Sequence, residues 1–195
     1  MQRSSDAHAN ERQPDDNLVS KFGPAFIRPF IDSDADALFE AVRESYAEVS
    51  PWMAWCRPDY SKEHAAAWIR ATVAGHATGS SYEFAVFDAS GTLAGVCGVN
   101  HVNNVDRFAN CGYWIRTSLS RRGIAPAAVL AVAEWTFANT HLNRLEIVAA
   151  VDNTGSQRVA QKVGAAREAV LRQRMMVGGV PSDAVMYSLV RPTTI

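Results

Sequence analysis

The segment from residue 110 to residue 141 constrains the fold most, because it joins three different local patterns. An apolar strand-like run, NCGYWIR, is followed by a basic glycine turn, SRRGIA, and then by a helix-forming run, PAAVLAVAEWTFANTH. Pro126 suits the first turn of a helix, where an amide hydrogen has no intrahelical partner. Amides at a helix start carry partial positive charge, and two arginines precede them here. The segment therefore predicts a strand that leads into a helix whose N-terminus can hold phosphate.

Strand-like and helical runs are mixed along the rest of the chain. The strand-like runs are AFIRPF, YEFAVFD, TLAGVCGVNHV and RLEIVAAV, followed by a closing hairpin of AAREAVLRQRMMV and SDAVMYSLV about a Gly-Gly turn. Helices are predicted over residues 33–46, where Ser33 and Asp36 are spaced as a capping box, after Ser61, and over DNTGSQRVAQKVG. Because strands precede, flank and follow the helices, the pattern predicts an α+β fold with a mixed sheet.

The composition limits the classes of protein to which the chain can belong. Its 195 residues suit one buried domain, and a formal net charge of -1 provides no cationic field for nucleic acid or a membrane surface. Residues 1–23 are polar and poor in large apolar groups, so we expect a disordered tail before a single domain over 24–195. Three cysteines without metal-ligand spacing, scattered histidines and no long apolar run predict a cytoplasmic protein without a metal or a membrane span.

Several motifs follow one another in a specific order, namely GYWIR, SRRGIA, a long helical run, LEIVAAV, DNTGSQRVAQKVG and a terminal hairpin. In this order they resemble the GNAT superfamily of acyl-CoA-dependent N-acetyltransferases, and within it the RimJ/RimL type that acetylates ribosomal-protein N-termini. The resemblance runs from about Ala25 to the C-terminus. It implies a central mixed, mostly antiparallel twisted sheet of about seven strands with about four flanking helices. It also implies acetyl-CoA as cosubstrate and an amine acceptor, and it leaves a homodimer open.

The phosphate loop of that family reads Gln or Arg, two residues, Gly, one residue, then Gly or Ala. Gly123 and Ala125 match, while Ser120 departs at the first position, which matters little where backbone amides bind the pyrophosphate. The resemblance places backbone groups for the pantetheine arm where the GYWIR strand separates from LEIVAAV. The cofactor residues so implied are Ile115, Arg116, Thr117, Arg121, Arg122, Gly123, Ile124, Ala125, Asn153 and Ser156. Simpler interpretations stay open, because the arginines can form a solvated turn and Asn153 can merely cap a helix.

Acetyl transfer requires a neutral amine, a polarised thioester carbonyl and a proton for the departing thiolate. Many GNAT enzymes carry a tyrosine on the helix after the asparagine, but Ala160 stands there, and the resemblance gives the proton-donor role to Ser156. A glutamate described for the RimJ/RimL type is also missing, since Met175 occupies its position. The candidates for a general base are Glu83, His101, Glu44 and Glu48. Each of the four can instead be an ordinary polar residue at the surface or at a strand end.

We expect the acceptor to be an α-amino group of a peptide, protein or small molecule. Near pH 7.4, freeing a lysine amine of pKa about 10.4 costs roughly 4 kcal/mol, against roughly 0.6 kcal/mol for an α-amine of pKa about 7.8, and a site with few bases suits the second. Trp52, Trp55 and Asn100 are predicted to contact the acceptor, although tryptophans often pack in a core instead. The alternative function is a GNAT-fold sensor or interaction module that binds acyl-CoA with little catalysis.

Overall fold

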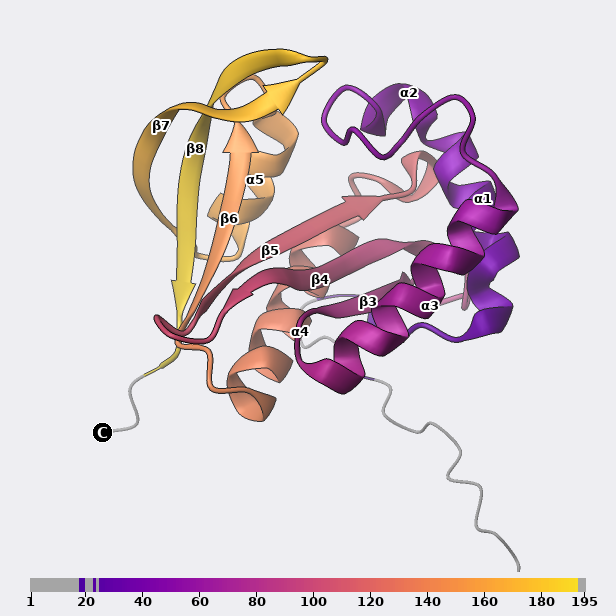
Figure 1. Cartoon of the computed structure of the whole chain (residues 1–195), viewed down its shortest axis with the longest axis horizontal. Helices are drawn as coiled ribbons and strands as arrows, with labels where there is room; N and C mark the ends of the chain where they lie inside the picture. The colour runs from indigo at the N-terminus through magenta and orange to yellow at the C-terminus, as the bar shows by residue number, and fades with distance from the viewer. Residues whose placement is uncertain (1–17, 20–22, 24, 193–195) are drawn as a thin grey trace, which may run out of the picture.

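The computed structural model describes residues 18–19, 23 and 25–192, which form one eight-stranded sheet with helices on both faces (Figure 1). The strands are β1 (Leu18–Val19), β2 (Phe26–Pro29), β3 (Tyr82–Phe87), β4 (Leu93–Asn103), β5 (Phe108–Ile115), β6 (Arg144–Ala150), β7 (Ala166–Val177) and β8 (Val180–Val190). The helices are α1 (Ala35–Glu44), α2 (Tyr46–Val49), α3 (Lys62–Thr78), α4 (Ile124–Asn139) and α5 (Thr154–Lys162). The predicted α+β fold with a mixed, mostly antiparallel sheet is confirmed, because only β5 and β6 pair in parallel along the order β1-β2-β3-β4-β5-β6-β8-β7.

Side chains of the central strands alternate between two hydrophobic clusters, one on each face of the sheet. Phe84 and Cys97 pack on the face covered by α4. Ala85, Val96 and Trp114 pack on the opposite face, against α1 and α3. Both faces of β3, β4 and β5 are therefore covered, so any opening in this part of the molecule must lie at an end of the strands or under the helices.

The parallel pair of β5 and β6 is bonded only near its start, with register partners from Phe108↔Arg144 to Asn110↔Glu146. Beyond that point β5 stays paired with β4, and β6 stays paired with β8, but the two strands separate from each other. Figure 1 shows the sheet dividing here, with β3, β4 and β5 on one side and β6, β7 and β8 on the other. The opening lies between the C-terminal parts of two parallel strands, on the side of the sheet where open sheets commonly bind ligands.

The chain before β2 is described only in part. Leu18–Val19 pairs antiparallel with β2, and the predicted boundary after residue 23 stays a prediction. Residues 1–17 and 20–22 lie outside the described residues, and the single domain over 24–195 stays a prediction. None of the helices in the described residues is long and apolar enough to cross a bilayer.

The predicted capping box of Ser33 and Asp36 is wrong, because α1 begins after a short 3-10 turn and its N-cap residue is Asp34. The Asp34 carboxylate accepts from both terminal guanidinium nitrogens of Arg28, each at 2.7 Å. This ion pair ties the helix start to β2 and overrides the local pattern, since bidentate pairs fix geometry strongly. The predicted cap of α3 is confirmed, because the Ser61 hydroxyl accepts from an amide one turn into the helix.

Candidate active site

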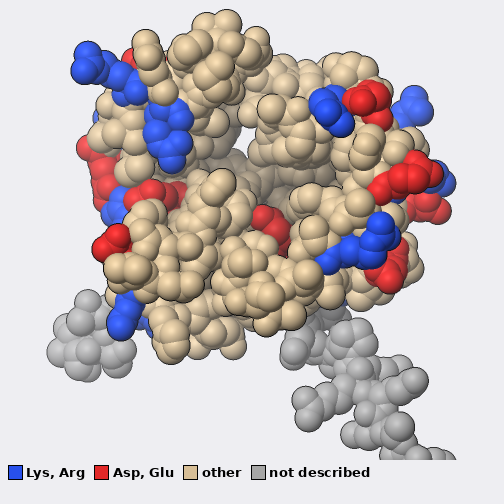
Figure 2. Space-filling view, in the orientation of Figure 1, with Lys and Arg blue, Asp and Glu red and all other residues tan. Residues whose placement is uncertain are grey.

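A cavity of about 500 Å³ fills the opening between β5 and β6, and we call it the split cavity. Figure 2 shows this face of the molecule hollowed near its middle. Its lining includes Tyr113 and Ile115 of β5, Val148 and Ala150 of β6, Asn153 and Ser156 at the start of α5, and Ala125 at the start of α4. Beyond Asn110 the facing edges of β5 and β6 have no strand partner among the described residues. Their backbone groups are therefore placed to bond an extended, amide-bearing ligand as a further strand would.

Helix α4 begins at the predicted glycine turn. Arg121 has a φ of +61° and Gly123 a φ of +81°, both in the left-handed region that favours glycine. A Cβ at Gly123 would meet nothing within 4 Å, so this glycine serves the backbone angle and not close packing. Within the described residues the amides of Gly123 and Ile124 have no hydrogen-bond acceptor, and Arg121 and Arg122 are exposed. The turn therefore combines free amides with two exposed cations, the groups that bind an anion at a helix start.

Arg116 and Thr117, two of the predicted cofactor residues, have partners inside the protein. The amide of Arg116 donates to a carbonyl of β4 at 2.7 Å, and its Nε lies 2.5 Å from Glu44 Oε2. The amide of Thr117 donates to a serine hydroxyl at the end of α1 at 3.0 Å, and its own hydroxyl donates to Glu48 at 3.1 Å. These bonds hold α1 and α2 against the end of β5. Of the three residues predicted here, only Ile115 lines the split cavity, and the cofactor role of all three stays a prediction.

The four candidate bases occupy different environments. Burial raises the pKa of the Glu44 carboxyl, but hydrogen bonds from Ser118 and Arg116 outweigh this effect, so its pKa is lowered. Glu44 and Glu48 thus serve as bonded anions that tie the helices to β5. His101 is exposed, lines the split cavity and has a φ of +51° where the β4–β5 register shifts. Glu83 lies elsewhere, in a second cavity.

At the start of α5, Asn153 and Ser156 line the split cavity, and Asn153 also caps the helix, because its Oδ1 accepts from the amide of Ser156 at 3.0 Å. Asn153 is thus a helix cap, as the simpler interpretation of the sequence expected, and its contact with a cofactor stays a prediction. Tyr113, which the sequence analysis missed, donates from its hydroxyl to the carbonyl of Ser156 at 3.0 Å, and the two hydroxyl oxygens lie 3.0 Å apart. Burial raises the pKa of the Tyr113 phenol, so it keeps its proton at neutral pH. A tyrosine hydroxyl from β5 therefore lies beside Ser156, although α5 carries Ala160 at the position where many GNAT enzymes have a tyrosine.

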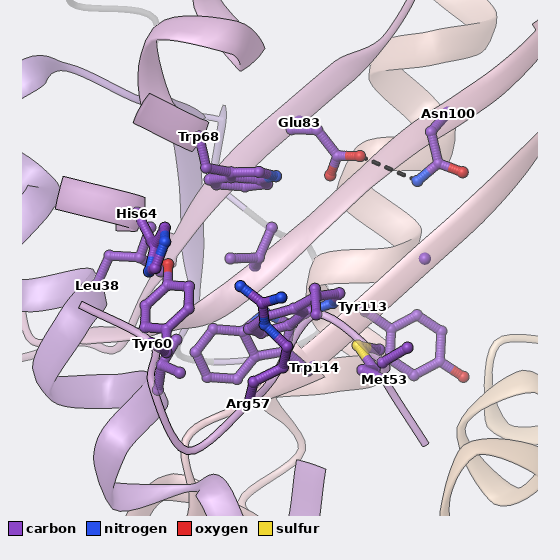
Figure 3. Close-up of a pocket in the computed structure, with 15 residues that line it drawn as sticks. Leu38, Met53, Arg57, Tyr60, His64, Trp68, Glu83, Asn100, Tyr113 and Trp114 are labelled. Carbon is purple, nitrogen blue, oxygen red and sulfur yellow. Dashed lines mark hydrogen bonds between the residues drawn. The ribbon is translucent and has the colours of Figure 1, made fainter. Parts of the chain in front are cut away.

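The second cavity, of about 510 Å³, lies on the face of the sheet covered by α1 and α3, and we call it the acceptor-side cavity (Figure 3). Its floor follows one row across three strands, because Glu83 of β3 is opposite Gly98 of β4, which is opposite Gly112 of β5. A Cβ at Gly98 would lie 2.1 Å from Oε2 and 2.6 Å from Cα of Glu83, whereas a Cβ at Gly112 would meet nothing closer than 3.6 Å. Gly98 thus gives the Glu83 side chain its space, and Gly112 keeps the floor open.

Hydrogen bonds across the next row position the Glu83 carboxylate. Asn100 Nδ2 donates to Glu83 Oε1 at 3.0 Å, as Figure 3 shows, and Asn110 Nδ2 donates to Asn100 Oδ1 at 2.9 Å. His76 of α3 also bonds the backbone carbonyl of Glu83 through Nε2 at 2.9 Å. Burial raises the pKa of the Glu83 carboxyl, and the hydrogen bond from Asn100 opposes this only in part. A positioned carboxyl of raised pKa inside a cavity is suited to accepting a proton near neutral pH.

Aromatic side chains form the walls of the acceptor-side cavity. They include Trp55, Tyr60, Trp68 and Trp114. The ring of Trp55 lies 5.9 Å from that of Tyr60 and 5.8 Å from that of Trp114. Of the predicted acceptor residues, Trp55 and Asn100 line this cavity together with Glu83, whereas Trp52 lines the split cavity.

The two cavities meet across β5. Both are lined by Met53, Gly112, Tyr113 and Trp114. Gly112 carries no side chain at this junction, and Tyr113 and Trp114 point to opposite faces of the strand, as alternation requires. Because Gly112 has no side chain, a group bound in the split cavity can approach a group bound beside Glu83 without a side chain between them.

A sheet that opens between two parallel strands, with free amides at a helix start near the opening and a carboxyl-lined cavity across it, is suited to a transferase that uses an extended cosubstrate. Residues 25–166 match the family model described as Acetyltransferase (GNAT) domain. The chain belongs to the GNAT acetyltransferase family, and it is an acetyl-CoA-dependent N-acetyltransferase of the RimL-like group.

Similar proteins support this placement. The chain is 28% identical over 178 residues to "Putative ribosomal N-acetyltransferase YdaF" of Bacillus subtilis (strain 168), covering 85% of this chain and 90% of that protein. It superposes with a TM-score of 0.81, at 23% identity, on the RimL ribosomal L7/L12 alpha-N-protein acetyltransferase in complex with coenzyme A, covering 88% of this chain and 96% of that one. It superposes equally, with a TM-score of 0.81 at 20% identity, on the microcin C7 self immunity acetyltransferase MccE in complex with acetyl-CoA and AMP, covering 89% and 98%.

Proposed function

We propose that the protein transfers the acetyl group of acetyl-CoA to the α-amino group of a peptide or small molecule that enters the acceptor-side cavity. The observation that carries this proposal is the position of Glu83, a carboxyl of raised pKa on the floor of a cavity that joins the split cavity at Gly112. One carboxylate at the junction is sufficient to take the proton that an amine loses on acylation.

The residues of the split and of the α4 turn would hold acetyl-CoA, which supplies a thioester carbonyl and a thiolate leaving group. The amides of Gly123, Ile124 and Ala125 bind the diphosphate, with added charge from Arg121 and Arg122. The open edges of β5, including Ile115, and of β6 bond the pantetheine amides. Support for this assignment comes from the free amides at the turn and the unpaired strand edges described above. These groups orient the carrier and leave its reactive end facing the junction.

One group of side chains takes the proton of the amine, and another donates a hydrogen bond to the leaving sulfur. Glu83, held by Asn100, accepts the proton of the attacking amine directly or through one water. Ser156 donates a hydrogen bond to the departing sulfur, and the single proton of the Tyr113 hydroxyl turns from the Ser156 carbonyl to the serine hydroxyl oxygen, which lies 3.0 Å away. His101 faces the cofactor side, so we assign it no step.

An α-amine fits this site better than a lysine side chain, because the cost of deprotonation differs. Near pH 7.4 the neutral form costs roughly 0.6 kcal/mol for an α-amine and roughly 4 kcal/mol for lysine. Among the four candidate bases only Glu83 combines a raised pKa with a place in the acceptor-side cavity. A single base of this kind can deprotonate an α-amine, because a sizeable fraction of such an amine is already neutral at this pH.

The test compares two peptides that differ only in which amine is free. One has a free N-terminus and no lysine, and the other has an acetylated N-terminus and one lysine. Thiol release from acetyl-CoA at pH 7.4 should give a kcat/KM about 300-fold higher for the first peptide, the ratio that corresponds to the difference of about 3.4 kcal/mol between the two deprotonation costs. A higher kcat/KM for the lysine peptide would refute the proposal of an α-amine acceptor.

A further inference from the structure

The acceptor-side cavity is larger and more aromatic than a small amine requires. Its volume of about 510 Å³ falls in the range of sites that enclose drug-sized ligands, about 300–1,000 Å³. The Trp55 side chain is 41% exposed beside the buried ring of Trp114, so its face gains from being covered by an apolar group. The apolar lining continues with Leu38, Val42, Met53 and Val96. Most of the cavity wall therefore offers dispersion contacts and no hydrogen bonds.

The polar side chains of the described lining are few beside its rings and aliphatic groups. At the floor, Glu83 and Asn100 are bonded to each other. At the other end His64 Nδ1 already accepts from the amide of Ser61 at 3.1 Å, and Arg57, which pairs with exposed Asp59 at 3.3 Å, reaches toward the middle of the view from a loop (Figure 3). Between these ends a flat apolar group would lie against ring faces.

We propose that the acceptor carries a large apolar side chain, preferably an aromatic one, on the carbon that bears the reacting amine. This inference rests on the proposed function, since it takes the amine to lie beside Glu83. With the amine at the floor, the side chain on the adjacent carbon extends between Trp55, Tyr60, Trp68 and Trp114. The shared chemistry is an aromatic α-amine, which either a protein N-terminus or a free amino acid derivative can present.

The direct test needs no variant. Peptides that differ only at their first residue, Phe, Trp, Ala or Ser, are compared by kcat/KM for thiol release, together with phenylalanine amide as a small-molecule acceptor. We expect Phe and Trp peptides to exceed Ala and Ser peptides by about 30-fold, because a buried ring gains about that factor over a methyl group. Equal rates for the peptide and for phenylalanine amide indicate a small-molecule site, and a much faster peptide indicates a protein N-terminus. In both cases the ring preference supports the inference.

Trp52 and Trp55 provide a matched pair of variants, because the first lines the split cavity and the second the acceptor-side cavity. Trp55→Ala should reduce the Phe-to-Ala ratio of kcat/KM at least about fivefold while the Kd for CoA, measured by calorimetry, stays within twofold. Trp52→Ala should leave that ratio unchanged and weaken CoA binding. A wild-type enzyme that prefers Ser or Ala peptides, or equal ratios in the two variants, would overturn the inference while the α-amine proposal stands. Turnover of no α-amine at all would instead defeat the proposed function.

Discussion

Replacement of Glu83 by glutamine tests the proposed base with little change in shape. The glutamine side chain would keep an oxygen that can accept from Asn100 at the present 3.0 Å, and it would keep the volume that lies over Gly98. It loses only the ability to take a proton. Since a positioned general base contributes about 10²–10⁴-fold, and water can replace part of this, we expect kcat/KM to fall about 100-fold, equivalent to about 2.7 kcal/mol of barrier.

The pH dependence separates loss of a base from a general disturbance of the site. In the wild type, catalysis requires both a neutral amine and an ionised Glu83, so log kcat/KM should rise with a slope of 2 below both pKa values. In Glu83→Gln only the amine titrates, and the slope should be 1. The assay is thiol release from acetyl-CoA with one α-amine acceptor, from pH 9 down to about pH 4, below the ordinary pKa of a glutamate. A variant within about threefold of wild type with an unchanged slope would refute the role of Glu83.

The substitution Glu83→Gln should lower activity, but it should raise the stability of the fold. Burial raises the pKa of Glu83 above its ordinary 4.5, so the folded state holds this proton more tightly than the unfolded state. The resulting stabilisation is fully present below pH 4.5 and is lost as pH rises through the folded-state pKa. Glu83→Gln should therefore have a higher Tm than wild type at pH 8, and the difference should shrink toward pH 4.5. A variant that is less stable at pH 8 would contradict this account.

Four further substitutions test the neighbouring parts of the site. Tyr113→Phe should lower kcat about 10-fold and change the Kd for CoA less than threefold, and a change only in Kd would contradict a role at the sulfur. Gly98→Ala should destabilise the fold by about 1–3 kcal/mol in urea titrations, because its Cβ would lie 2.6 Å from the Cα of Glu83, whereas Gly112→Ala should unfold like wild type but turn over more slowly. Gly123→Ala, at a φ of +81°, should cost about 1 kcal/mol and weaken CoA binding, and unchanged affinity by calorimetry would count against the amide cradle.

Features that depend on local pattern could be predicted from the sequence. The strand, glycine turn and helix around Gly123 form as expected, because their pattern is contained in about 30 consecutive residues. The capping pattern of Ser33 failed because an ion pair with Arg28 of β2 places the helix start at Asp34. The spacing rule for a capping box takes no account of such a contact with the preceding strand.

The floor of the acceptor-side cavity could not be read from the sequence, because it depends on register between strands. Glu83, Gly98 and Gly112 are far apart in the chain and become neighbours only through the β3–β4–β5 pairing. Tyr113 was missed for the same reason, since its partner Ser156 lies 43 residues away. A signal was present, because Gly98 and Gly112 interrupt apolar strands in which glycine is otherwise unfavourable, and such glycines often mark a close approach.

The residues on the floor of the acceptor-side cavity reduce the stability of the sheet, and this favours a catalytic role over simple cofactor binding. A partly buried carboxyl of raised pKa and two glycines inside central strands are each intrinsically unfavourable in a sheet, where β-branched residues have the higher strand propensity. A module that only sensed acyl-CoA would use the split cavity and the α4 turn, and neither Glu83 nor Gly98 lines the split cavity. Locally unfavourable residues that converge on the junction between two cavities are typical of a site where chemistry occurs. In the proposed function, this second cavity brings the amine to the acetyl group.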